Sequence, residues 1–300
     1  MSDIELFQWT ERTPMQLPRA GCAVAAVGGK LLVAGGTYWR EGKKFWCADV
    51  TRFDPSANRW ETVAPLPQAR GDAPAAVLGD TLYVFGGGAD GMPVNTVFAF
   101  QNDRWSVRPE IVLPAPRRSF SVVVIGQTFF LFGGMAGIWT DYGSVASTFW
   151  AYEANRGWWS LPYLPGTTRF NVAIGVVDGR IIVAGGCSAI DGQVRNLDEI
   201  FSYDPDSRSW TLIGRLSVAS RGASGLADGN RLFYFGGYTD KFETAIWSID
   251  PASGWVKAAG QLPCGLADTR FARIGTSIIG ATGENGIKMR FAGTIEASRG

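Results

Sequence analysis

Glycine pairs recur along this chain at a nearly constant interval, and each pair ends an apolar run. The runs read LLVAGG, LYVFGG, FFLFGG, IIVAGG and LFYFGG, with first glycines at Gly35, Gly86, Gly133, Gly185 and Gly236. These glycines are 51, 47, 52 and 51 residues apart, and a degraded copy, SIIGATG, ends at Gly283. A period of about 50 residues is typical of a propeller, in which each repeat forms one four-stranded sheet. The repeat therefore predicts an all-β, six-bladed β-propeller.

A second marker, a tryptophan on each expected fourth strand, runs in step with the first. The tryptophans are Trp9, Trp60, Trp105, Trp159, Trp210 and Trp255. Their regular register predicts that they pack between blades. The first stands before any glycine pair, whereas the last glycine-containing run is followed by a strand without tryptophan. We therefore expect the N-terminal segment IELFQWTER to complete the sixth blade, which leaves the ring without an open edge. Residues 1–300 are expected to form a single domain.

Loop lengths predict which face of the ring carries function. Short hairpin signals such as Gly28-Gly29 and Asp178-Gly179 separate the first two strands of a repeat, and Asp-Pro turns separate the last two. In an antiparallel blade both kinds of turn lie on one face. The longer insertions TYWREGKKFWC, MAGIWTDYGSVAS and CSAIDGQVRN follow the glycine pairs and lie on the other. Because function usually resides in loops on a rigid scaffold, we expect binding on this long-loop face, around the channel mouth.

Composition excludes several functional classes. The net charge of +1 gives no bulk attraction to nucleic acid or to an anionic membrane. The first residues lack the basic and apolar regions of a signal peptide, and the four cysteines form no C-x-x-C pair, so a cytoplasmic location is expected. The chain has no histidine, which removes histidine-based nucleophile activation and the usual imidazole metal ligands. We expect no metal site and no cofactor.

The repeat resembles a known family. A glycine pair after an apolar strand, a (Y/F)-D-P turn, a tryptophan, and Leu-Pro followed by arginine are together similar to the kelch repeat. The resemblance extends over essentially the whole chain and implies a kelch-type propeller. Its members include adaptor domains that bind peptides and, more distantly, sialic acid mutarotases. The copper enzyme galactose oxidase also shares the fold, but its histidine ligands are missing here. The sixth repeat departs from the pattern at Thr282-Gly283 and in its arginine position.

Arginines near the expected innermost strands form the first set of candidate binding residues. They are Arg19, Arg70, Arg117 with Arg118, Arg169, Arg221 and, less well matched, Arg270. If they converge at the channel mouth, their guanidinium groups would form an anion-favouring pocket. Alternatively, each bonds carbonyl groups and holds the ring together. Loop aromatics form the second set, because they stack on sugars or anchor peptide side chains: Trp39, Trp139, Tyr142 and Tyr238.

Two functions from different classes remain open. The first is a non-catalytic recognition module for an acidic peptide or protein. The alternative is a mutarotase or epimerase that acts on a carboxylated sugar, with Glu284 as its catalytic carboxylate and Arg195 in support. Glu284 is the preferred candidate because it directly follows a glycine-containing strand end near the channel. Whether the chain is an enzyme is left open by the sequence.

Overall fold

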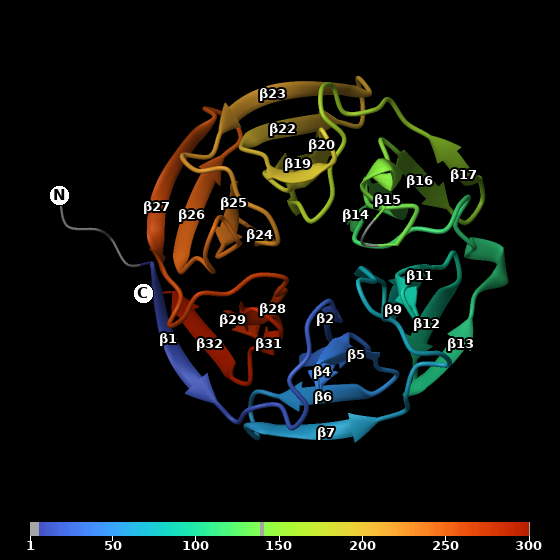
Figure 1. Cartoon of the computed structure of the whole chain (residues 1–300), viewed down its shortest axis with the longest axis vertical. Helices are drawn as coiled ribbons and strands as arrows, with labels where there is room; N and C mark the ends of the chain where they lie inside the picture. The colour runs from blue at the N-terminus through green and yellow to red at the C-terminus, as the bar shows by residue number, and fades with distance from the viewer. Residues whose placement is uncertain (1–5, 139–140, 300) are drawn as a thin grey trace.

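Six four-stranded antiparallel sheets stand around a common axis in the computed structural model, which describes residues 6–138 and 141–299 (Figure 1). This is the predicted six-bladed β-propeller. The predicted ring closure is also confirmed: β1 (Phe7–Arg12) pairs with β32 (Thr294–Arg299) as the outermost strand of the last blade. The two ends of the described chain therefore hold each other, as the neighbouring blue and red strands in Figure 1 show.

Each blade runs from an innermost strand at the channel to an outermost strand at the rim. The first three blades contain, in this order, β2 (Ala23–Val27), β3 (Lys30–Ala34), β6 (Val50–Asp54) and β7 (Arg59–Val63); β8 (Ala75–Leu78), β9 (Thr81–Phe85), β12 (Val97–Gln101) and β13 (Arg104–Val107); and β14 (Ser121–Ile125), β15 (Thr128–Phe132), β16 (Phe149–Glu153) and β17 (Gly157–Ser160).

The last three blades repeat this order. They contain β18 (Ala173–Val177), β19 (Arg180–Ala184), β22 (Glu199–Asp204) and β23 (Ser209–Arg215); β24 (Ser224–Asp228), β25 (Arg231–Phe235), β26 (Ala245–Asp250) and β27 (Trp255–Gln261); and β28 (Phe271–Ile274), β29 (Ser277–Gly280), β32 and β1. The two 3₁₀ turns, η1 (Pro109–Ile111) and η2 (Tyr142–Ser144), are the helices of the described residues. Neither is long and apolar enough to cross a membrane.

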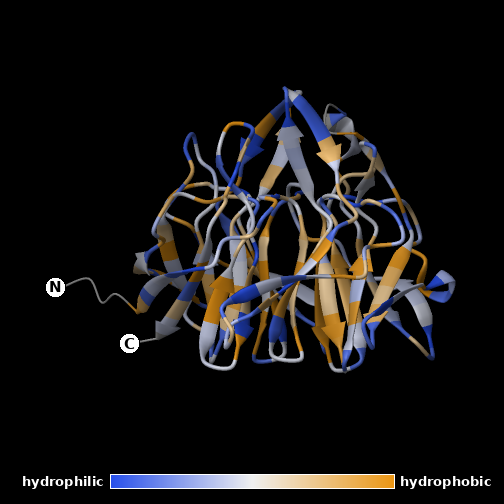
Figure 2. Cartoon of the chain, turned by 90° about the horizontal axis from the view of Figure 1, so that it is seen from below, coloured by the Kyte–Doolittle hydropathy of each residue, from blue (hydrophilic) through white to orange (hydrophobic). Residues whose placement is uncertain are grey.

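Four further hairpins rise from the loops that follow three of the glycine pairs and, in blade six, Thr282-Gly283. They are β4 (Thr37–Arg40) with β5 (Lys43–Trp46), β10 (Gly88–Ala89) with β11 (Met92–Pro93), β20 (Cys187–Ile190) with β21 (Gln193–Asn196), and β30 (Glu284–Gly286) with β31 (Met289–Arg290). Figure 2 shows short turns along one face of the ring and longer, projecting segments on the other. The structure therefore has the predicted long-loop face.

The second glycine of each pair links its blade to the next one. The amide of Gly36 donates to the carbonyl oxygen of Arg70 at 2.6 Å, and the amide of Gly87 donates to that of Arg117 at 2.8 Å. The first glycine makes room for this contact. A Cβ on Gly133 would lie within 3.0 Å of the Arg169 carbonyl oxygen, and the φ angle of Gly133 is 67°. Glycine is therefore required by both space and conformation.

A ring of residues in the left-handed backbone conformation forms the throat of the channel. Its members, one from each blade, are Gly21, Asp72, Ser119, Asn171, Gly222 and Asp268, with φ angles between 48° and 69°. Backbone hydrogen bonds connect them in succession: the amide of Asp72 donates to Gly21, that of Ser119 to Asp72, and that of Asp268 to Gly222. Two polar side chains of blade two and blade six, Asp72 and Asp268, are thereby fixed at the throat.

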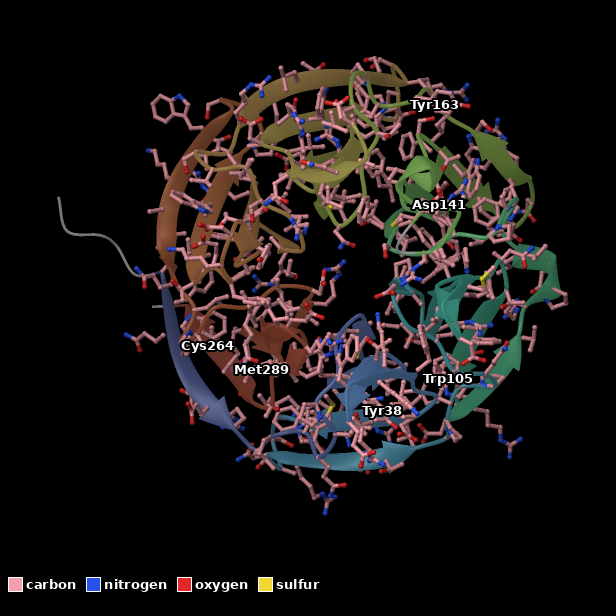
Figure 3. All side chains as sticks on the ribbon, in the orientation of Figure 1. Tyr38, Trp105, Asp141, Tyr163, Cys264 and Met289 are labelled. Carbon is pink, nitrogen blue, oxygen red and sulfur yellow. The ribbon has the colours of Figure 1, made fainter. Side chains whose placement is uncertain are left out.

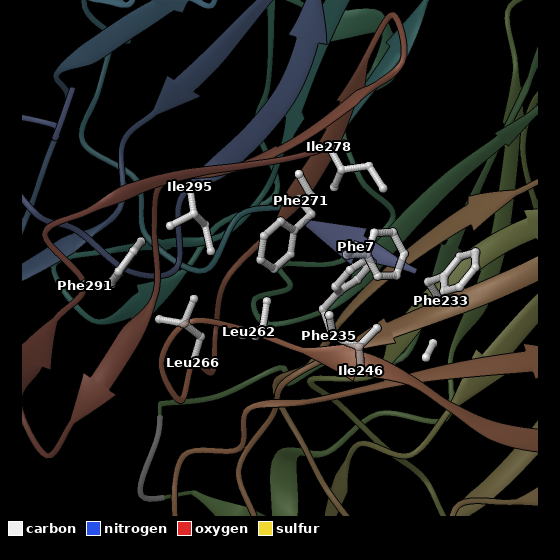
Figure 4. Close-up of a cluster of buried hydrophobic side chains, with 12 residues drawn as sticks. Phe7, Phe233, Phe235, Ile246, Leu262, Leu266, Phe271, Ile278, Phe291 and Ile295 are labelled. Carbon is white, nitrogen blue, oxygen red and sulfur yellow. The ribbon is translucent and has the colours of Figure 1, made fainter. Parts of the chain in front are cut away.

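The hydrophobic core lies between neighbouring sheets. Figure 4 shows how β1 contributes to it: Phe7 lies between blades five and six, 5.2 Å from Phe233 and 5.5 Å from Phe235 between ring centroids. Phe7 is 3% exposed. The closing strand therefore contributes a core side chain as well as backbone hydrogen bonds.

The repeated tryptophans pack between blades, with the exception of Trp255. The indole nitrogens of Trp60, Trp105 and Trp210 donate to the carbonyl oxygens of Thr13, Ala64 and Pro162, which follow the outermost strand of the preceding blade. In blade three the position opposite an aromatic residue of the third strand is Trp158, which packs on the cluster shared with blade two. The predicted Trp159, on the opposite face of the strand, packs on the cluster between blades three and four.

The prediction is wrong for Trp255, which is 63% exposed. Val256 stands opposite Ile249 on the third strand of blade five, whereas Trp255 stands opposite Asp250. Since neighbouring residues of a strand point to opposite faces, this shift by one position turns the indole outward.

Alanine at Gly133 tests the link between blades. The substitution adds a methyl group against a carbonyl oxygen and strains a left-handed residue, so we expect a loss of about 3 kcal/mol or more in unfolding free energy. Gly126→Ala is the matched control, because Gly126 has a φ of 60° but nothing within 4 Å of its added Cβ. It should lose only the conformational part, about 1 kcal/mol. Equal losses in urea denaturation would contradict the proposed steric requirement.

Truncation of Phe7 tests the closing strand. Phe7→Ala removes a buried ring from the cluster between blades five and six, so we expect a loss of about 3–5 kcal/mol. Gln8→Ala changes the neighbouring, exposed residue of the same strand and should cost less than 1 kcal/mol. Thermal and urea unfolding of both variants measure the difference. A stability loss at Phe7 no larger than that at Gln8 would show that the closure contributes little.

Candidate functional site

A cavity of about 490 Å³ opens on the long-loop face above blades five, six and one. Two hairpins, β4–β5 and β30–β31, contribute to its wall. Its polar and aromatic lining residues are Thr37, Trp39, Lys44, Asp72, Asn171, Arg221, Tyr238, Phe242, Asp268, Glu284 and Lys288. A volume of this size accepts a small molecule or a few side chains of a partner.

Three carboxyl groups line this cavity, and two of them resist ionisation. Burial raises the pKa of Asp268, and the nearby charge of Asp72 raises it further. Burial, followed by the charge of Asp268, raises the pKa of Glu284 to about 7, against the opposing influence of Arg290 and Lys44. Each carboxyl thus disfavours the ionised form of its neighbour. Near neutral pH, the Glu284 carboxyl group is therefore partly protonated and can then donate a hydrogen bond.

The cations of the cavity are held against aromatic rings. The Arg221 guanidinium lies 4.6 Å from the centroid of the Tyr238 ring and donates to Asn196 Oδ1 at 2.6 Å. Lys288 lies 4.9 Å from the ring of Trp39. Both lysines of the lining, Lys44 and Lys288, come from the hairpins, and the carboxyl groups Asp72 and Asp268 come from the throat. The wall of the cavity is therefore cationic and aromatic, and its floor, at the throat of the channel, is acidic.

Most of the predicted arginine set lies elsewhere. Arg19, Arg70 and Arg169 are at most 1% exposed. Arg19 donates to the carbonyl oxygens of Gly35 and Asp49, at 2.9 and 2.6 Å. Arg70 donates to Thr96 Oγ1 at 2.6 Å, and Arg169 donates to the Gly185 carbonyl oxygen at 3.3 Å. These guanidinium groups each hold loops of their own blade, and none of them lines the cavity.

The predicted arginines occupy two adjacent positions of the repeat, rather than a single equivalent one. Arg118 and Arg221 form backbone bridges with Met135 and Tyr238, on equivalent loops. Arg19, Arg70, Arg117 and Arg169 stand one residue earlier in their repeats. The shift of one residue reverses the direction of the side chain. Arg118 pairs with Asp72 and with the Gly91 carbonyl oxygen, whereas Arg221 lines the cavity.

The geometry therefore does not bring a ring of arginines together at the channel mouth. Arg221 is the one member of the predicted set that lines the cavity. Arg270 lies deeper, in the channel itself. For Arg19, Arg70 and Arg169 the physical reason is that guanidinium donors are used by carbonyl and hydroxyl groups of the loops that carry the glycine pairs.

The predicted aromatic residues are divided in the same way. Trp39 and Tyr238 line the cavity. Trp139 lies outside the described residues, and Tyr142 begins η2, where the description covers the backbone alone. Sequence reasoning missed Phe242 and the two lysines, Lys44 and Lys288. A usable signal was their position in segments that directly follow a glycine pair.

The two residues of the enzymatic hypothesis are separated. Glu284 lines the cavity and pairs with Arg290 at 2.6 Å. Arg195 is 54% exposed on β21 and pairs with Asp191, at the tip of its own hairpin. Arg195 is not part of the cavity lining. Among the described residues, no three Cys, Asp or Glu side chains are grouped closely enough to hold a metal ion.

The fold and site together define a β-propeller with a ligand-sized cavity on its long-loop face. A family model, the KLHDC2/KLHL20/DRC7 Kelch-repeats domain, matches residues 21–237 and 75–283. The chain therefore belongs to the kelch-repeat family.

Relatives from distant organisms agree with this assignment. The chain is 26% identical to Kelch-like protein terF of Aspergillus terreus over 76% of this chain and 51% of that protein. It is 28% identical to Kelch-like protein 35 of Mus musculus over 68% of this chain and 33% of that protein, and 28% identical to Kelch-like protein 23 of Homo sapiens over 71% and 36%. The matched region spans between a third and a half of these relatives.

The titration of Glu284 tests the electrostatics of the cavity. A ¹³C NMR titration of its carboxyl group should give a midpoint near pH 7. Because the folded-state pKa is raised, the protonated carboxyl stabilises the fold. This stabilisation is present below the ordinary glutamate pKa and is lost as the pH rises through 7.

Glu284→Gln should remove this pH-dependent term. The difference in unfolding free energy between wild type and variant should change by on the order of 2 kcal/mol between pH 4 and pH 8. Glu41→Gln, on the exposed turn of the β4–β5 hairpin, controls for the loss of a carboxylate. A Glu284 midpoint below pH 5 would contradict the buried environment described above.

Proposed function

We propose that this chain is a protein-recognition module that binds a segment of its partner over the long-loop cavity. The observation that carries the proposal is the combination of this cavity with projecting apolar side chains on the surrounding loops. Ile287 is 82% exposed, and Met92 and Met289 are each 60% exposed. In Figure 3, Tyr38 and Met289 lie over blades one and six, which are neighbours in the ring. Exposed apolar residues around a cavity are typical of a protein-binding surface.

Aromatic side chains supply the anchoring surface. Trp39 and Tyr238 are held by Lys288 and Arg221, respectively, and Tyr238 also packs against Phe242 with ring centroids 5.1 Å apart. Rings fixed in this way lose little conformational freedom when a partner binds, and aromatic residues dominate the energy of many interfaces. We expect a partner side chain to enter between Trp39 and Tyr238.

An acidic partner segment suits the cations of the cavity wall. Arg221, Lys44 and Lys288 attract carboxylate groups. Asp268 and Glu284 repel them when ionised, but the Glu284 pKa of about 7 reduces this repulsion as the pH falls through neutrality, and the raised pKa of Asp268 acts in the same direction. Binding of an acidic segment should therefore strengthen as the pH falls from 8 to 6. Kelch-like relatives make a protein partner the preferred class of ligand.

An isomerase for carboxylated sugars is the second candidate. It is favoured by one observation, the Glu284 pKa of about 7, which suits a general acid or base at neutral pH. Arg195 has no part in it, since it lies outside the cavity, and Arg290 is the cation that contacts Glu284. NMR exchange spectroscopy with a sialic acid tests this function. Anomer exchange above the spontaneous rate that disappears in Glu284→Gln would support it, and the spontaneous rate alone would exclude it.

Selection from a random peptide library tests the recognition function. Peptides enriched on the wild-type protein should be rich in Asp and Glu, and Trp39→Ala combined with Tyr238→Ala should weaken their binding at least tenfold. Trp255→Ala, which removes an exposed tryptophan from the outermost strand of blade five, is the matched control and should not change affinity. Affinities follow from fluorescence anisotropy. Equal binding by the double variant, or no enriched peptide, would contradict the proposed surface.

A further inference from the structure

The hairpin β30–β31, which forms part of the cavity wall, carries the one Asn-Gly pair of the sequence, Asn285-Gly286. Every other asparagine of the chain is followed by a larger residue, namely Arg, Thr, Asp, Val or Leu. Asn285 is exposed, and it stands in the chain between Glu284 and Lys288, which both line the cavity. The recognition function gives Asn285 no role, but a chemical change at this residue would alter the cavity wall.

An Asn-Gly pair can rearrange without an enzyme. The backbone nitrogen of Gly286 attacks the side-chain carbonyl carbon of Asn285, the C–N bond to the side-chain amino group breaks, and ammonia leaves with the proton of the Gly286 amide. Water then opens the resulting succinimide ring at either of its two carbonyl carbons, which gives aspartate or isoaspartate. Water is the only co-reactant. Glycine favours the first step, because it has no Cβ beside the attacking nitrogen and its backbone is free to rotate.

The local structure of the hairpin permits the two atoms to approach. Glu284 pairs with Arg290 and Gly286 pairs with Met289, so Asn285 is the extra residue of a β-bulge and has no partner in the strand register. The strands β30 and β31 contain three and two residues. A short, solvent-exposed hairpin opens locally at a much lower free energy than a strand inside a blade. The backbone around Asn285 can therefore rotate without unfolding of the propeller.

Deamidation would place a new negative charge in the wall of the cavity. The charge of Asp268 already raises the pKa of Glu284, and a carboxylate on the adjacent residue would raise it further. The same charge would offset those of Lys44 and Lys288, which attract an acidic partner. In the isoaspartate product the main chain also gains a methylene group, which displaces Ile287 and Lys288 relative to β30.

We propose that Asn285 is a site of spontaneous deamidation and that its product weakens the binding of an acidic partner at the long-loop cavity. The modification follows from the hairpin and is independent of any partner. Its effect on affinity rests on the recognition function proposed above. The hairpin thereby acts as an irreversible timer, since protein that has aged in solution binds its partner less tightly than newly made protein.

Peptide mapping of the whole protein tests the modification. The protein is incubated at mildly alkaline pH in water enriched in ¹⁸O, so that each carboxyl group formed during incubation carries the heavy isotope, and its peptides are analysed by mass spectrometry. Asn285 should give aspartate and isoaspartate at least severalfold faster than Asn230, which is exposed on the β24–β25 turn but is followed by Arg231. Equal rates at the two asparagines would overturn the proposed site.

Gly286→Ala tests the role of the glycine. Alanine fits the backbone, because Gly286 is not in the left-handed conformation, and the nearest neighbours of the added Cβ are atoms of Met289, an exposed and flexible side chain. The added methyl group hinders the attacking nitrogen, so deamidation of Asn285 should slow severalfold. An unchanged rate in this variant would also overturn the proposed site.

Asn285→Asp has the charge of one product and tests the effect on the cavity, whereas Asn285→Gln retains a neutral amide. The Glu284 midpoint in a ¹³C NMR titration should be higher in Asn285→Asp than in wild type. Acidic peptides selected on the wild-type protein should bind Asn285→Asp severalfold more weakly and Asn285→Gln as tightly as wild type. Asn230→Asp adds the same charge on the short-turn face and should change neither quantity.

The two proposals fail by different results. An unchanged affinity of Asn285→Asp for the selected peptides would overturn the regulatory effect and leave the recognition function intact. An unchanged Glu284 midpoint would overturn the electrostatic mechanism. The recognition function itself fails if no peptide is enriched on the wild-type protein.

Discussion

The hydrogen bond from the second glycine of each pair to the following blade organises the propeller. Its acceptor is the carbonyl oxygen of Arg70, Arg117, Arg169, Ser220 or Leu266, and Gly283 completes the series by donating to Arg19. The acceptor residue is arginine in some blades and serine or leucine in others, but the backbone hydrogen bond is present in every blade. The link therefore depends on backbone geometry, and the arginines add a second connection, from the guanidinium group back to the loop of their own blade.

The period of the repeat was enough to predict the architecture, because each blade must place a glycine pair at the same contact. Ring closure was also predictable, since Trp9 has no glycine pair before it and the sixth repeat has no tryptophan after it. The direction of individual side chains was less accessible. Adjacent tryptophans at Trp158 and Trp159 cannot be distinguished by a period of about 50 residues, although one residue reverses the face. The same ambiguity affected the arginine set.

Electrostatics was the least predictable property of the site. Asp72 comes from blade two, and Asp268 and Glu284 come from blade six, so their proximity depends on closure of the ring. Their pKa values depend on burial and on one another, and neither quantity is visible in the spacing of residues. The sequence did indicate Glu284 as the preferred carboxylate, because its position after a strand end near the channel is a local property. Arg195, chosen on its loop alone, lies outside the cavity.

The position of the cavity follows from the size of the side chain at one equivalent position in each blade. The residues that form the equivalent bridges to the long loops are Ala20, Gly71, Arg118, Phe170, Arg221 and Ala267. At this position blade one has Ala20 and blade six has Ala267. The throat residues beside the cavity include Gly21 and Gly222. Because these residues are small, space remains above blades six and one. Over blade two, Trp46 from the β4–β5 hairpin packs against Gly71, and blades three and four fill the place with Arg118 and Phe170.

A regular ring thus acquires an asymmetric binding surface through small side chains in the repeats that join its two ends. The arginine at this place in blade five, Arg221, then lies at the edge of the open space and is the one that can contact a ligand. In blade six the repeated arginine is replaced by Leu266, and the nearest arginine, Arg270, is displaced along the chain into the channel. The irregular repeats therefore supply the candidate binding site, whereas the backbone link between blades is common to all repeats.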